Sequence, residues 1–329
     1  MLRTLFIAAL VSSSALAVPA HAQSAAWPDR PITIVGGFPG GAGTDLYARR
    51  MGIDLSKILG VAIVADNRTG AGGNVASDLV ARAAPDGYTY LLGTAGTHAI
   101  NPALYKNLSF DVEKDFAHIA LLGDVPNVLL VNPKKHPDIK TCADLIALAK
   151  AKPGQLNYSS TGNGASGHLA GALFTKGAGV NVLHVPYRGQ GPAMTALLSG
   201  EVDFFFNQSA PAIAAVNSGQ AVALGVTTSQ RISALPDVPT VAEACNIPNY
   251  ESSTWYGLFA PAKVPADIQA RMSDAVIKVI ETPEFKTWLT TTQGVTPPKD
   301  PSPEAFKKIH QADMKRWAEV VKMSGASVD

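Results

Sequence analysis

The sequence predicts an α/β fold made of two units, each a mixed, mostly parallel sheet flanked by helices. The chain has 329 residues, which at roughly 150 residues per domain indicates about two domains. Short apolar runs alternate with helical patterns in the order β-α-β-α-β from residue 31, and the pattern restarts after about residue 120. Such alternation is typical of parallel strands covered by helices. The chain is 47% hydrophobic and 16% charged, which favours packed cores and excludes a disordered chain.

In the first unit, each apolar run ends in a turn or at a helix start. The strand at 31–35 runs into the glycine-rich turn 36–43, and Thr44 or Asp45 can cap the helix that follows. Residues 67–73 form a second glycine-rich loop, and 85–88 form a turn because proline presets φ and glycine accepts positive φ. The expected strands are 31–35, 61–64 and 88–93, and the expected helices are 46–59 and 74–84.

The second unit repeats this alternation, and a helical tail follows it. A glycine-rich segment, 161–167, again separates a strand from a helix. The expected strands are 128–131, 155–159, 182–185, 204–206 and 224–227, with helices at 142–151, 168–176 and 193–199. After a strand at 255–259, the tail holds helices at about 266–281, 283–292 and 303–323.

The first 22 residues resemble a cleaved signal peptide. Arg3 provides a positive start, Leu5 to Val18 is an apolar run, and Ala20-His21-Ala22 matches the small-x-small pattern of a cleavage site. The alternatives are a buried N-terminal helix or a membrane anchor, but the apolar run is shorter than the span of about 20 residues that a bilayer requires. We therefore expect cleavage after Ala22 and export of a soluble protein.

Charge and composition exclude several partners and cofactors. Lys plus Arg is 27 and Asp plus Glu is 26, so the chain lacks the basic field that would attract nucleic acid. Two cysteines cannot form a four-thiolate site, and the seven histidines show no H-x-x-x-H spacing, so we expect no metal. Residues 162–167 match G-x-G-x-x-G, yet no Asp or Glu lies about 20 residues later. We therefore expect no nucleotide cofactor.

The two glycine-rich loops indicate a site for an anionic ligand. Residues 32–47 and 156–169 both read strand, glycine-rich loop, helix. In open α/β sheets ligands bind at the carboxyl ends of strands, where helix N-termini attract anions. Two such loops facing each other across a cleft would suit a ligand with two anionic ends.

Several side chains near these loops leave more than one interpretation open. Ser166 and His168 form the basis of an alternative, an exported hydrolase, although nothing in the sequence marks a third member of a triad. Arg188, in a turn after a strand, fits a ligand contact and a structural salt bridge equally well. Arg49 and Arg50 lie within a helix, where solvation or pairing is the simpler interpretation.

A series of motifs resembles one family along nearly all of the mature chain. The opening Trp27-Pro-Asp-Arg-Pro-Ile32 and Phe38-Pro-Gly-Gly-Ala-Gly-Thr-Asp45 are similar to the start of the Bug family, the periplasmic solute-binding proteins of tripartite tricarboxylate transporters. The remaining motifs, in family order, are Asn67–Asn74, Ala84–Tyr88, Gly93–Pro102, Tyr158–Leu169, His184–Gly189 and Pro236–Glu243.

The resemblance implies a two-lobed, type II-like periplasmic binding protein that closes on its ligand and is no enzyme. Its ligand is a small mono-, di- or tricarboxylate, aliphatic or aromatic, held largely by backbone amides and ordered waters in the cleft between the lobes. The ligand-binding positions carried over are Phe38, Gly41, Ala42, Gly43, Thr44, Asp45, Thr94 and Ala95 in the first lobe, and Ser160, Thr161, Ser166, Tyr187, Arg188 and Asn207 in the second.

This sequence also departs from the family pattern. Gly40 stands where the family usually has proline, and Ala42 where it usually has a second glycine. Ser166-Gly167 occupies a variable position. Phe38 fits either stacking on a flat ligand or anchoring of the loop, with anchoring slightly favoured. Asp45 is expected to be a cap or a water anchor rather than a partner of the ligand's charge.

The function expected from these observations is delivery of a captured carboxylate to membrane transporter subunits, by a protein that acts as a monomer. A subunit that presents its ligand to a sensor is the further alternative. We expect discontinuous lobes, residues 26–124 with 248–329 and residues 125–247, because a strand and a helical tail follow the two loop units. Cys142 and Cys245 are expected to pair, since an exported chain with two cysteines can oxidise them; two buried thiols are the alternative.

Overall fold

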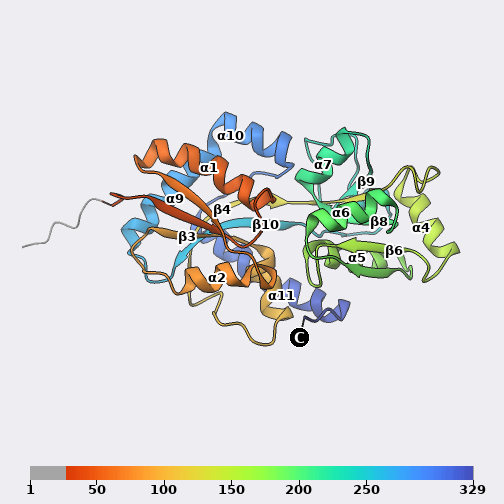
Figure 1. Ribbon diagram of the computed structural model, residues 1–329, viewed down its shortest axis with the longest axis horizontal. Coiled ribbons are helices and arrows are strands. Elements are labelled where there is room, and N and C mark those ends of the chain that lie inside the picture. The colour runs from red at the N-terminus through yellow and green to blue at the C-terminus, as the bar shows by residue number, and fades with distance from the viewer. Residues whose placement is uncertain (1–26, 329) are drawn as a thin grey trace, which may run out of the picture.

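A computed structural model describes residues 27–328 and shows two lobes, each built on a five-stranded sheet (Figure 1). The expected signal peptide, residues 1–22, lies outside the described residues. The strand order is β2-β1-β3-β10-β4 in the first lobe and β7-β6-β8-β5-β9 in the second. One reversed strand in each sheet, β10 or β5, makes two antiparallel pairings. Both sheets are therefore mixed, as expected, but parallel pairings are no majority among the described strands.

The strands of each lobe come from separate parts of the chain. The first sheet contains β1 (Ile32–Gly36), β2 (Ile63–Asn67), β3 (Thr89–Thr94), β4 (Phe116–Val125) and β10 (Thr254–Pro261). The second sheet contains β5 (Asn127–Val131), β6 (Asn157–Ser160), β7 (Leu183–Pro186), β8 (Phe204–Gln208) and β9 (Val222–Val226). The chain passes from the first sheet to the second at Pro126, between β4 and β5, and returns before β10.

The helices follow the same division. In the first lobe they are α1 (Gly43–Leu59), η1 (Ala71–Gly73), α2 (Asn74–Ala81), η2 (Gly96–Ile100), α3 (Asn101–Leu104), α9 (Ala266–Glu281), α10 (Pro283–Thr287), η3 (Trp288–Gln293) and α11 (Pro303–Ser324). In the second lobe they are α4 (Cys142–Ala151), α5 (Ser166–Ala178), α6 (Gln190–Ser199), α7 (Ser209–Asn217) and α8 (Val241–Ala244). None of the helices within residues 27–328 is long and apolar enough to cross a membrane.

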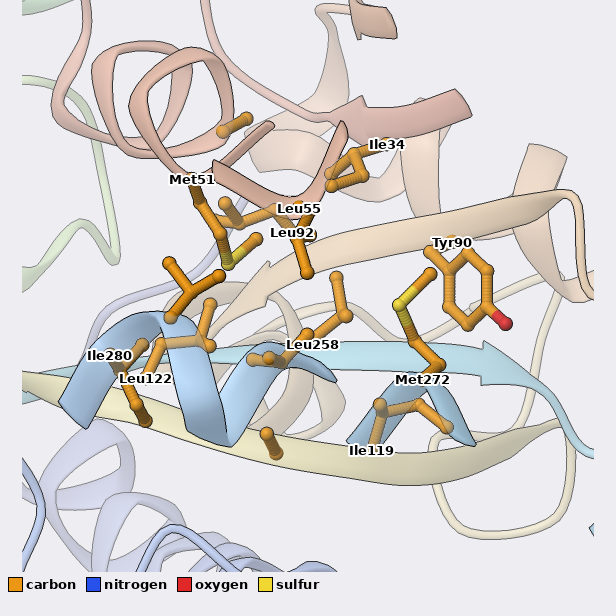
Figure 2. Close-up of a cluster of buried hydrophobic side chains, with 14 of the residues drawn as sticks. Ile34, Met51, Leu55, Tyr90, Leu92, Ile119, Leu122, Leu258, Met272 and Ile280 are labelled. Carbon is orange, nitrogen blue, oxygen red and sulfur yellow. The ribbon is translucent and has the colours of Figure 1, made fainter. Parts of the chain in front are cut away.

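Helices cover both faces of each sheet, and successive side chains of a strand point alternately into the two core clusters. In the first lobe, Ile34 and Leu92 face the cluster formed with α1 and α9, which Figure 2 shows around Met51, Leu55 and Met272. Val35 and Leu91 face the opposite cluster, formed with α2, η2 and α11. In the second lobe, Phe204 and Phe206 pack toward α4 and α5, and Phe205 packs toward α6 and α7.

Five of the described elements were not foreseen from the sequence: β4, η1, η2, α3 and α7. The strand β4 contains Ala117, His118, Gly123 and Asp124, which interrupt its apolar run. The turn region after β3 forms η2 and α3, and the alanine-rich segment after β8 forms α7. The expected helix at 283–292 divides into α10 and η3.

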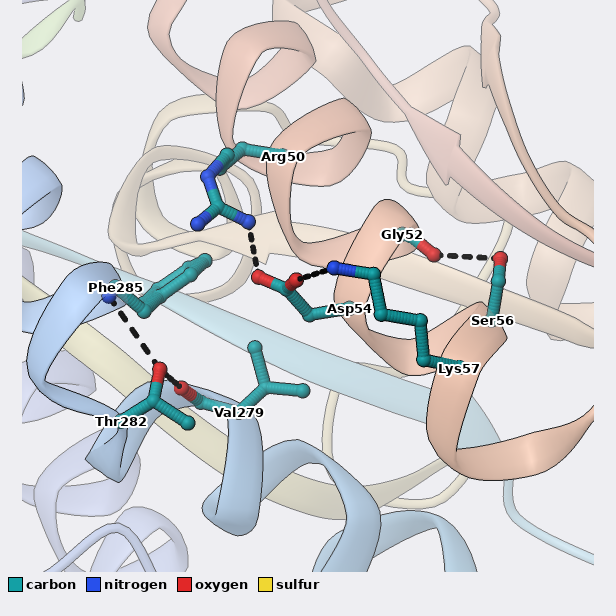
Figure 3. Close-up of polar contacts among 8 residues, drawn as sticks. All are labelled: Arg50, Gly52, Asp54, Ser56, Lys57, Val279, Thr282 and Phe285. Atoms are coloured by element: carbon teal, nitrogen blue, oxygen red, sulfur yellow. Dashed lines mark hydrogen bonds and ion pairs between the residues drawn. The ribbon is translucent and has the colours of Figure 1, made fainter.

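Polar contacts fix α1, the helix that follows the first glycine-rich loop. Asp54 pairs with Arg50 and also lies 3.0 Å from the Lys57 ammonium (Figure 3). The Arg50 guanidinium stands 5.6 Å from the centre of the Phe285 ring on α10. Of the two expected alternatives, solvation or pairing, Arg50 is thus paired. The contact of its guanidinium with Phe285 joins α1 to the C-terminal part of the chain.

A disulfide joins Cys142 and Cys245, whose Cα atoms are 5.1 Å apart. It links the start of α4 to the residue that follows α8, so both ends lie in the second lobe. The expected disulfide is therefore present, and the alternative of two separate thiols is wrong.

Candidate functional site

The glycine-rich loops lie at the carboxyl ends of parallel strands, one in each lobe. In the first lobe β1 leads through residues 37–42 into α1, and in the second β6 leads through residues 161–165 into α5. Neither loop contains Lys or Arg. Any positive potential at these loops therefore comes from backbone N–H groups and the two helix dipoles, each equivalent to about half a positive charge.

The two helices begin without a side-chain cap. Their N-cap residues are Ala42 and Ala165, which cannot accept a hydrogen bond through the side chain. The helices α6 and α7, which follow β7 and β8, also begin without one, whereas α4, α8, α10 and α11 are capped by Ser or Thr. The first N–H groups of α1 and α5 are therefore not satisfied by a capping side chain.

The expectation that Thr44 or Asp45 caps α1 is wrong. The helix begins at Gly43, so both side chains lie within its first turn. Asp45 instead organises the loop before it. One carboxylate oxygen accepts the Gly41 N–H at 2.8 Å, and the other lies 2.7 Å from the Asn67 amide nitrogen and 2.8 Å from Arg49 Nε.

Asp45 is therefore an internal anchor of the loop. Burial opposes ionisation of its carboxyl, but the hydrogen bonds from Arg49, Gly41 and Asn67 outweigh burial and lower its pKa below the ordinary value. The Gly41 N–H that a ligand could otherwise use is donated to Asp45. Asp45 contributes to a site through the shape of the loop and not as a partner of the ligand's charge.

Phe38 contacts the neighbouring glycine-rich loop. A Cβ on Gly73 would lie 3.5 Å from the Phe38 ring, and one on Gly37 would lie 2.7 Å from the Gly73 Cα. The two loops thus pack backbone to backbone, with the half-buried Phe38 ring beside them. This contact supports the anchoring role that the sequence slightly favours.

The expected contacts after β3 form a closed turn. The Thr94 hydroxyl accepts the Thr97 N–H at 3.2 Å, and the Thr97 hydroxyl accepts the Thr94 N–H at 3.1 Å. Thr94 is 6% exposed and Ala95 is fully buried. These residues fix the backbone beside the first loop.

In the second lobe, Ser160 holds the loop from within. Its hydroxyl oxygen accepts the Gly162 N–H at 3.1 Å, donates to the Gly162 carbonyl at 2.9 Å and lies 2.7 Å from His184 Nε2. Thr161 is half-buried, and its carbonyl accepts the Gly189 N–H at 3.3 Å. The Ser160 side chain is fully buried, so its role is to shape the loop.

Ser166 and His168 have separate partners. The Ser166 hydroxyl donates to Asn127 Oδ1 at 3.3 Å, and His168 Nδ1 accepts the Gly164 N–H at 2.9 Å. The ring nitrogen that accepts a backbone N–H cannot also take a proton from a serine hydroxyl. This geometry disfavours the hydrolase that the sequence left open.

Tyr187 and Arg188 lie at the start of α6. The Tyr187 hydroxyl donates to Glu201 at 2.7 Å, and burial together with Glu201 raises the pKa of Tyr187 to about 12. The tyrosine hydroxyl is thus directed to the far end of α6. The Arg188 side chain is exposed, and among the described residues no ion pair to it is found.

The two lobes meet at the start of α1. A Cβ on Gly43 would lie 2.6 Å from the Tyr256 hydroxyl and 3.8 Å from Gln208 Oε1. Gln208 belongs to the second lobe and hydrogen-bonds the Tyr256 hydroxyl of the first, while burial raises the pKa of that hydroxyl. Only glycine at position 43 leaves room for this contact between lobes.

Two buried polar side chains stand next to this meeting point. The Thr44 hydroxyl and the Asn207 amide nitrogen have no hydrogen-bond partner among the described residues. Thr44 is 3% exposed and Asn207 is 1% exposed. The Asn207 oxygen accepts from the Gln190 amide at 2.7 Å, so its nitrogen remains free to donate. Both side chains were expected at the site from the sequence.

A cavity of about 510 Å³ opens at the junction of the two lobes, beside Gly43. Gly41, Gly43 and Leu46 line it from the first lobe, together with 291–293 of η3, and Gln190 and residues of α7 line it from the second. None of its lining residues carries a charge. The structure thus brings the first loop, α6 and α7 to one cavity, whereas the loop at 160–166 does not line it.

Three residues at this junction were not foreseen. Tyr256 lies in a strand whose apolar pattern indicates only a core position. Gln190 and Gln208 are uncharged side chains without a motif of their own. Their only signal in the sequence is their place beside expected site residues. Gln208 follows Asn207 at the end of β8, and Gln190 is the first residue of α6.

Comparison with known proteins agrees with this architecture. The family model described as tripartite tricarboxylate transporter family receptor matches residues 47–326. Protein BugT of Bordetella pertussis is 31% identical over 323 residues, which cover 98% of this chain and 97% of BugT.

Solved structures show the same fold. A protein of R. palustris with adipate has a TM-score of 0.85 and 33% identity, over 92% of this chain and 99% of that one. MatC from Rhodopseudomonas palustris with bound malate has a TM-score of 0.80 and 33% identity, over 90% of this chain and all (100%) of that one. The motif resemblance and the two-lobed fold class are thereby confirmed.

The match extends over most of the chain in both kinds of comparison. The chain belongs to the receptor family of tripartite tricarboxylate transporters, the Bug family, whose members are periplasmic solute-binding proteins and not enzymes.

Proposed function

We propose that this protein captures a small carboxylate with two anionic ends and delivers it to the membrane subunits of a tripartite tricarboxylate transporter. The observation that carries the proposal is the pair of uncapped helix starts in opposite lobes. The first intrahelical hydrogen bonds come from the N–H groups of Leu46 and Leu169. The N–H groups of residues 43–45 and 166–168 therefore precede the helical ladder and suit a carboxylate.

Two side chains add to these backbone donors. The Thr44 hydroxyl and the Asn207 amide nitrogen are buried without a partner among the described residues, and an unmet buried donor costs about 1–3 kcal/mol. A carboxylate oxygen or an ordered water at the junction would satisfy both. We assign the remaining expected residues, including Phe38, Thr94, Ser160 and Tyr187, to shaping of the loops.

Ligands of relatives support the substrate class. Adipate and malate, in the structures of the two R. palustris proteins, are both dicarboxylates. At this chain's first loop, Ala42 replaces the glycine that is usual in the family. The contacts that the first loop makes with a ligand therefore differ from those in relatives with glycine at this position. For this reason a ligand panel should also include aromatic dicarboxylates such as terephthalate.

We propose that the lobes comprise residues 26–124 with 248–329 and residues 125–247, joined by a hinge. Support comes from the crossing at Pro126 and from β10 in the first sheet. Tyr250 still packs in the core of the second lobe, so we propose that the return to the first lobe lies a few residues after 247, before β10. Closure about these crossings would bury the ligand between the loops.

We further propose that the protein is exported to the periplasm after cleavage behind Ala22 and works as a monomer that does not bind nucleic acid. The family is periplasmic, and the near-neutral charge of the chain supports the last point. N-terminal sequencing of the protein recovered from the periplasm tests the cleavage site: a mature chain that does not begin at Gln23 contradicts it.

A thermal-shift panel of carboxylates tests the proposed function. The panel contains adipate, malate, a tricarboxylate and terephthalate, with sodium chloride at matched ionic strength as the control. A ligand at 100 times its Kd stabilises the native state by about 2.7 kcal/mol, so the melting temperature should rise by several degrees for at least one of them. The bound ligand should be recovered unchanged. No shift with any carboxylate, or conversion of the ligand, would contradict the proposal.

A further inference from the structure

We infer that His168 and His184 are positioning residues that hold the second glycine-rich loop, residues 161–165, in its ligand-accepting shape through two neutral, stacked imidazoles. The inference rests on the proposed function for what the loop binds. The loop geometry itself is independent of that function. The two rings come from different elements, α5 and β7.

His168 holds the loop by accepting a backbone hydrogen bond. The Gly164 N–H donates to His168 Nδ1 at 2.9 Å. An imidazole nitrogen that accepts a hydrogen bond carries no proton, so the proton of the neutral His168 ring lies on Nε2. Protonation of Nδ1 would remove the acceptor and set two donors against each other.

His184 holds the other end of the loop through Ser160. The single Ser160 hydroxyl proton is donated to the Gly162 carbonyl at 2.9 Å, while its oxygen accepts the Gly162 N–H at 3.1 Å. His184 Nε2 lies 2.7 Å from the same oxygen. The proton count therefore makes His184 Nε2 the donor, which completes the hydrogen bonds of the serine.

Stacking joins the two supports into one unit. The His168 and His184 rings are 3.8 Å apart between centroids and inclined by 4°. The Tyr158 ring lies 5.0 Å from the His184 ring, and the Tyr158 hydroxyl donates to the His168 carbonyl at 3.2 Å. Two rings this close cannot both carry a positive charge without strong repulsion.

The surroundings keep both rings neutral. Burial lowers the pKa of His168 to about 4, and burial followed by the charge of His168 lowers the pKa of His184 to about 3. Tyr158 on β6 is the titratable group packed against the pair, and burial raises its pKa above the ordinary value. Among the described residues, no Asp, Glu, Lys or Arg contributes to the shift of either histidine.

The first experiment follows the imidazole and loop amide resonances of the ligand-free protein by NMR during an acid titration. The His168 and His184 rings should remain neutral down to about pH 5, and the Gly162 and Gly164 amides should shift with the same midpoint as the rings. Rings that titrate near pH 6.5, or loop amides that do not follow them, would overturn the inference.

The second experiment measures ligand affinity at pH 7.5 in matched variants. His168→Leu removes the acceptor, whereas His168→Asn places an amide oxygen near the position of Nδ1. His184→Leu removes the donor to Ser160, whereas His184→Gln retains one. We expect each leucine variant to weaken binding at least tenfold and each amide variant to remain within about threefold of the wild type.

Equal loss in the leucine and amide variants would show that the histidines serve packing alone and would overturn the inference. If a leucine variant does not fold, the NMR titration decides, because it uses the wild-type protein. If the wild type binds no carboxylate, the proposed function fails, while the titration still tests whether the rings and the loop act together.

Discussion

The two lobes come into contact at the start of α1. The contact is formed by Gly43 and Tyr256 of the first lobe and Gln208 of the second. The Tyr256 hydroxyl occupies the space that a side chain at position 43 would need, and Gln208 reaches it from the opposite lobe. Glycine here serves close approach, because residue 43 is the first residue of a regular helix and its backbone conformation is ordinary.

We expect Gly43→Ala to weaken ligand binding at least tenfold by forcing the Tyr256 hydroxyl out of place. A Cβ at position 43 would lie 2.6 Å from that hydroxyl but 3.6 Å from the Tyr256 Cζ, an ordinary contact. Gly43→Ala combined with Tyr256→Phe should therefore recover most of the affinity lost by Gly43→Ala alone. Calorimetric titration of the four members of this cycle measures the coupling.

The matched control is Gly191→Ala, also in the first turn of a helix, where an added Cβ would meet open space. It should change affinity by less than about twofold, since no contact is disturbed. An equal effect of alanine at positions 43 and 191, or strictly additive effects in the cycle, would contradict the argument.

The pKa of Asp124, on β4 next to the crossing between lobes, is shifted in the opposite direction to that of Asp45. Burial raises the pKa of its carboxyl to about 6 despite a hydrogen bond from Ser253, and the charge of Glu251 adds to the effect. Because the folded-state pKa exceeds the ordinary value of 3.8, ionisation of Asp124 is less favourable in the folded protein than in the unfolded chain, and it lowers the free energy of unfolding. The contribution of the protonated carboxyl to stability is fully present below pH 4 and is lost as the pH rises through about 6.

Asp124→Asn should therefore raise the free energy of unfolding by about 3 kcal/mol at pH 7.5 and by less than about 1 kcal/mol at pH 4. Urea unfolding of both proteins at the two pH values provides the measurement. A gain that is equal at both pH values, or a loss at pH 7.5, would show that ionisation of Asp124 does not carry this cost.

At the scale of elements, the strand–loop–helix units were readable from the sequence because their signals are local. Apolar runs, glycine clusters and helix periodicity each lie within about a dozen residues. Strand order was not readable, because it depends on pairings between distant segments. The insertion of β10 between β3 and β4, for example, joins residues more than a hundred positions apart.

The same division applies to the candidate site. Both loops could be predicted from glycine spacing, and Thr44 and Asn207 from family motifs. The Tyr256–Gln208 contact and the stacked histidines could not, since each arises from tertiary packing between separate elements. The cap assignment failed at α1 for a related reason. The Asp45 carboxylate accepts a hydrogen bond from the loop backbone, and the helix begins at Gly43, three residues before its expected start at 46.

We expect Gly41→Pro to reduce affinity more than Arg49→Ala. Gly41 has φ of +82° and donates its N–H to Asp45, and proline allows neither. Arg49→Ala removes one of the three donors around Asp45 but leaves the loop backbone intact. Calorimetry on both variants gives the order, and the reverse order would contradict the account of backbone recognition.

The Cys142–Cys245 bridge should stabilise the second lobe without affecting ligand binding. The cysteines are 103 residues apart in the sequence, and a closed loop of this size typically contributes about 2–4 kcal/mol. Cys142→Ala with Cys245→Ala should lower the free energy of unfolding by that amount in urea. Affinity for the ligand should remain within about twofold, and a large loss of affinity would place the bridge at the site.

At the scale of the whole molecule, the two lobes provide equivalent donors from opposite sides. Each sheet presents a glycine-rich loop and an uncapped helix at the carboxyl end of a parallel strand. Both loops lack cationic side chains, so under the proposed function the site recognises charge through oriented N–H groups. In the proposed complex, one carboxylate of the ligand is held by each lobe, which would couple binding to closure about the crossings near Pro126 and Ser252.

Calorimetric titration of dicarboxylates against monocarboxylates of the same length tests this central claim most directly. The pairs are adipate with hexanoate and terephthalate with benzoate, at one pH and ionic strength. The account predicts that the dicarboxylate of the cognate pair binds with a single site per chain and at least ten times more tightly, a difference of about 1.4 kcal/mol or more. Equal affinity for both members of every pair would show that the second lobe does not hold a carboxylate, and would contradict the account.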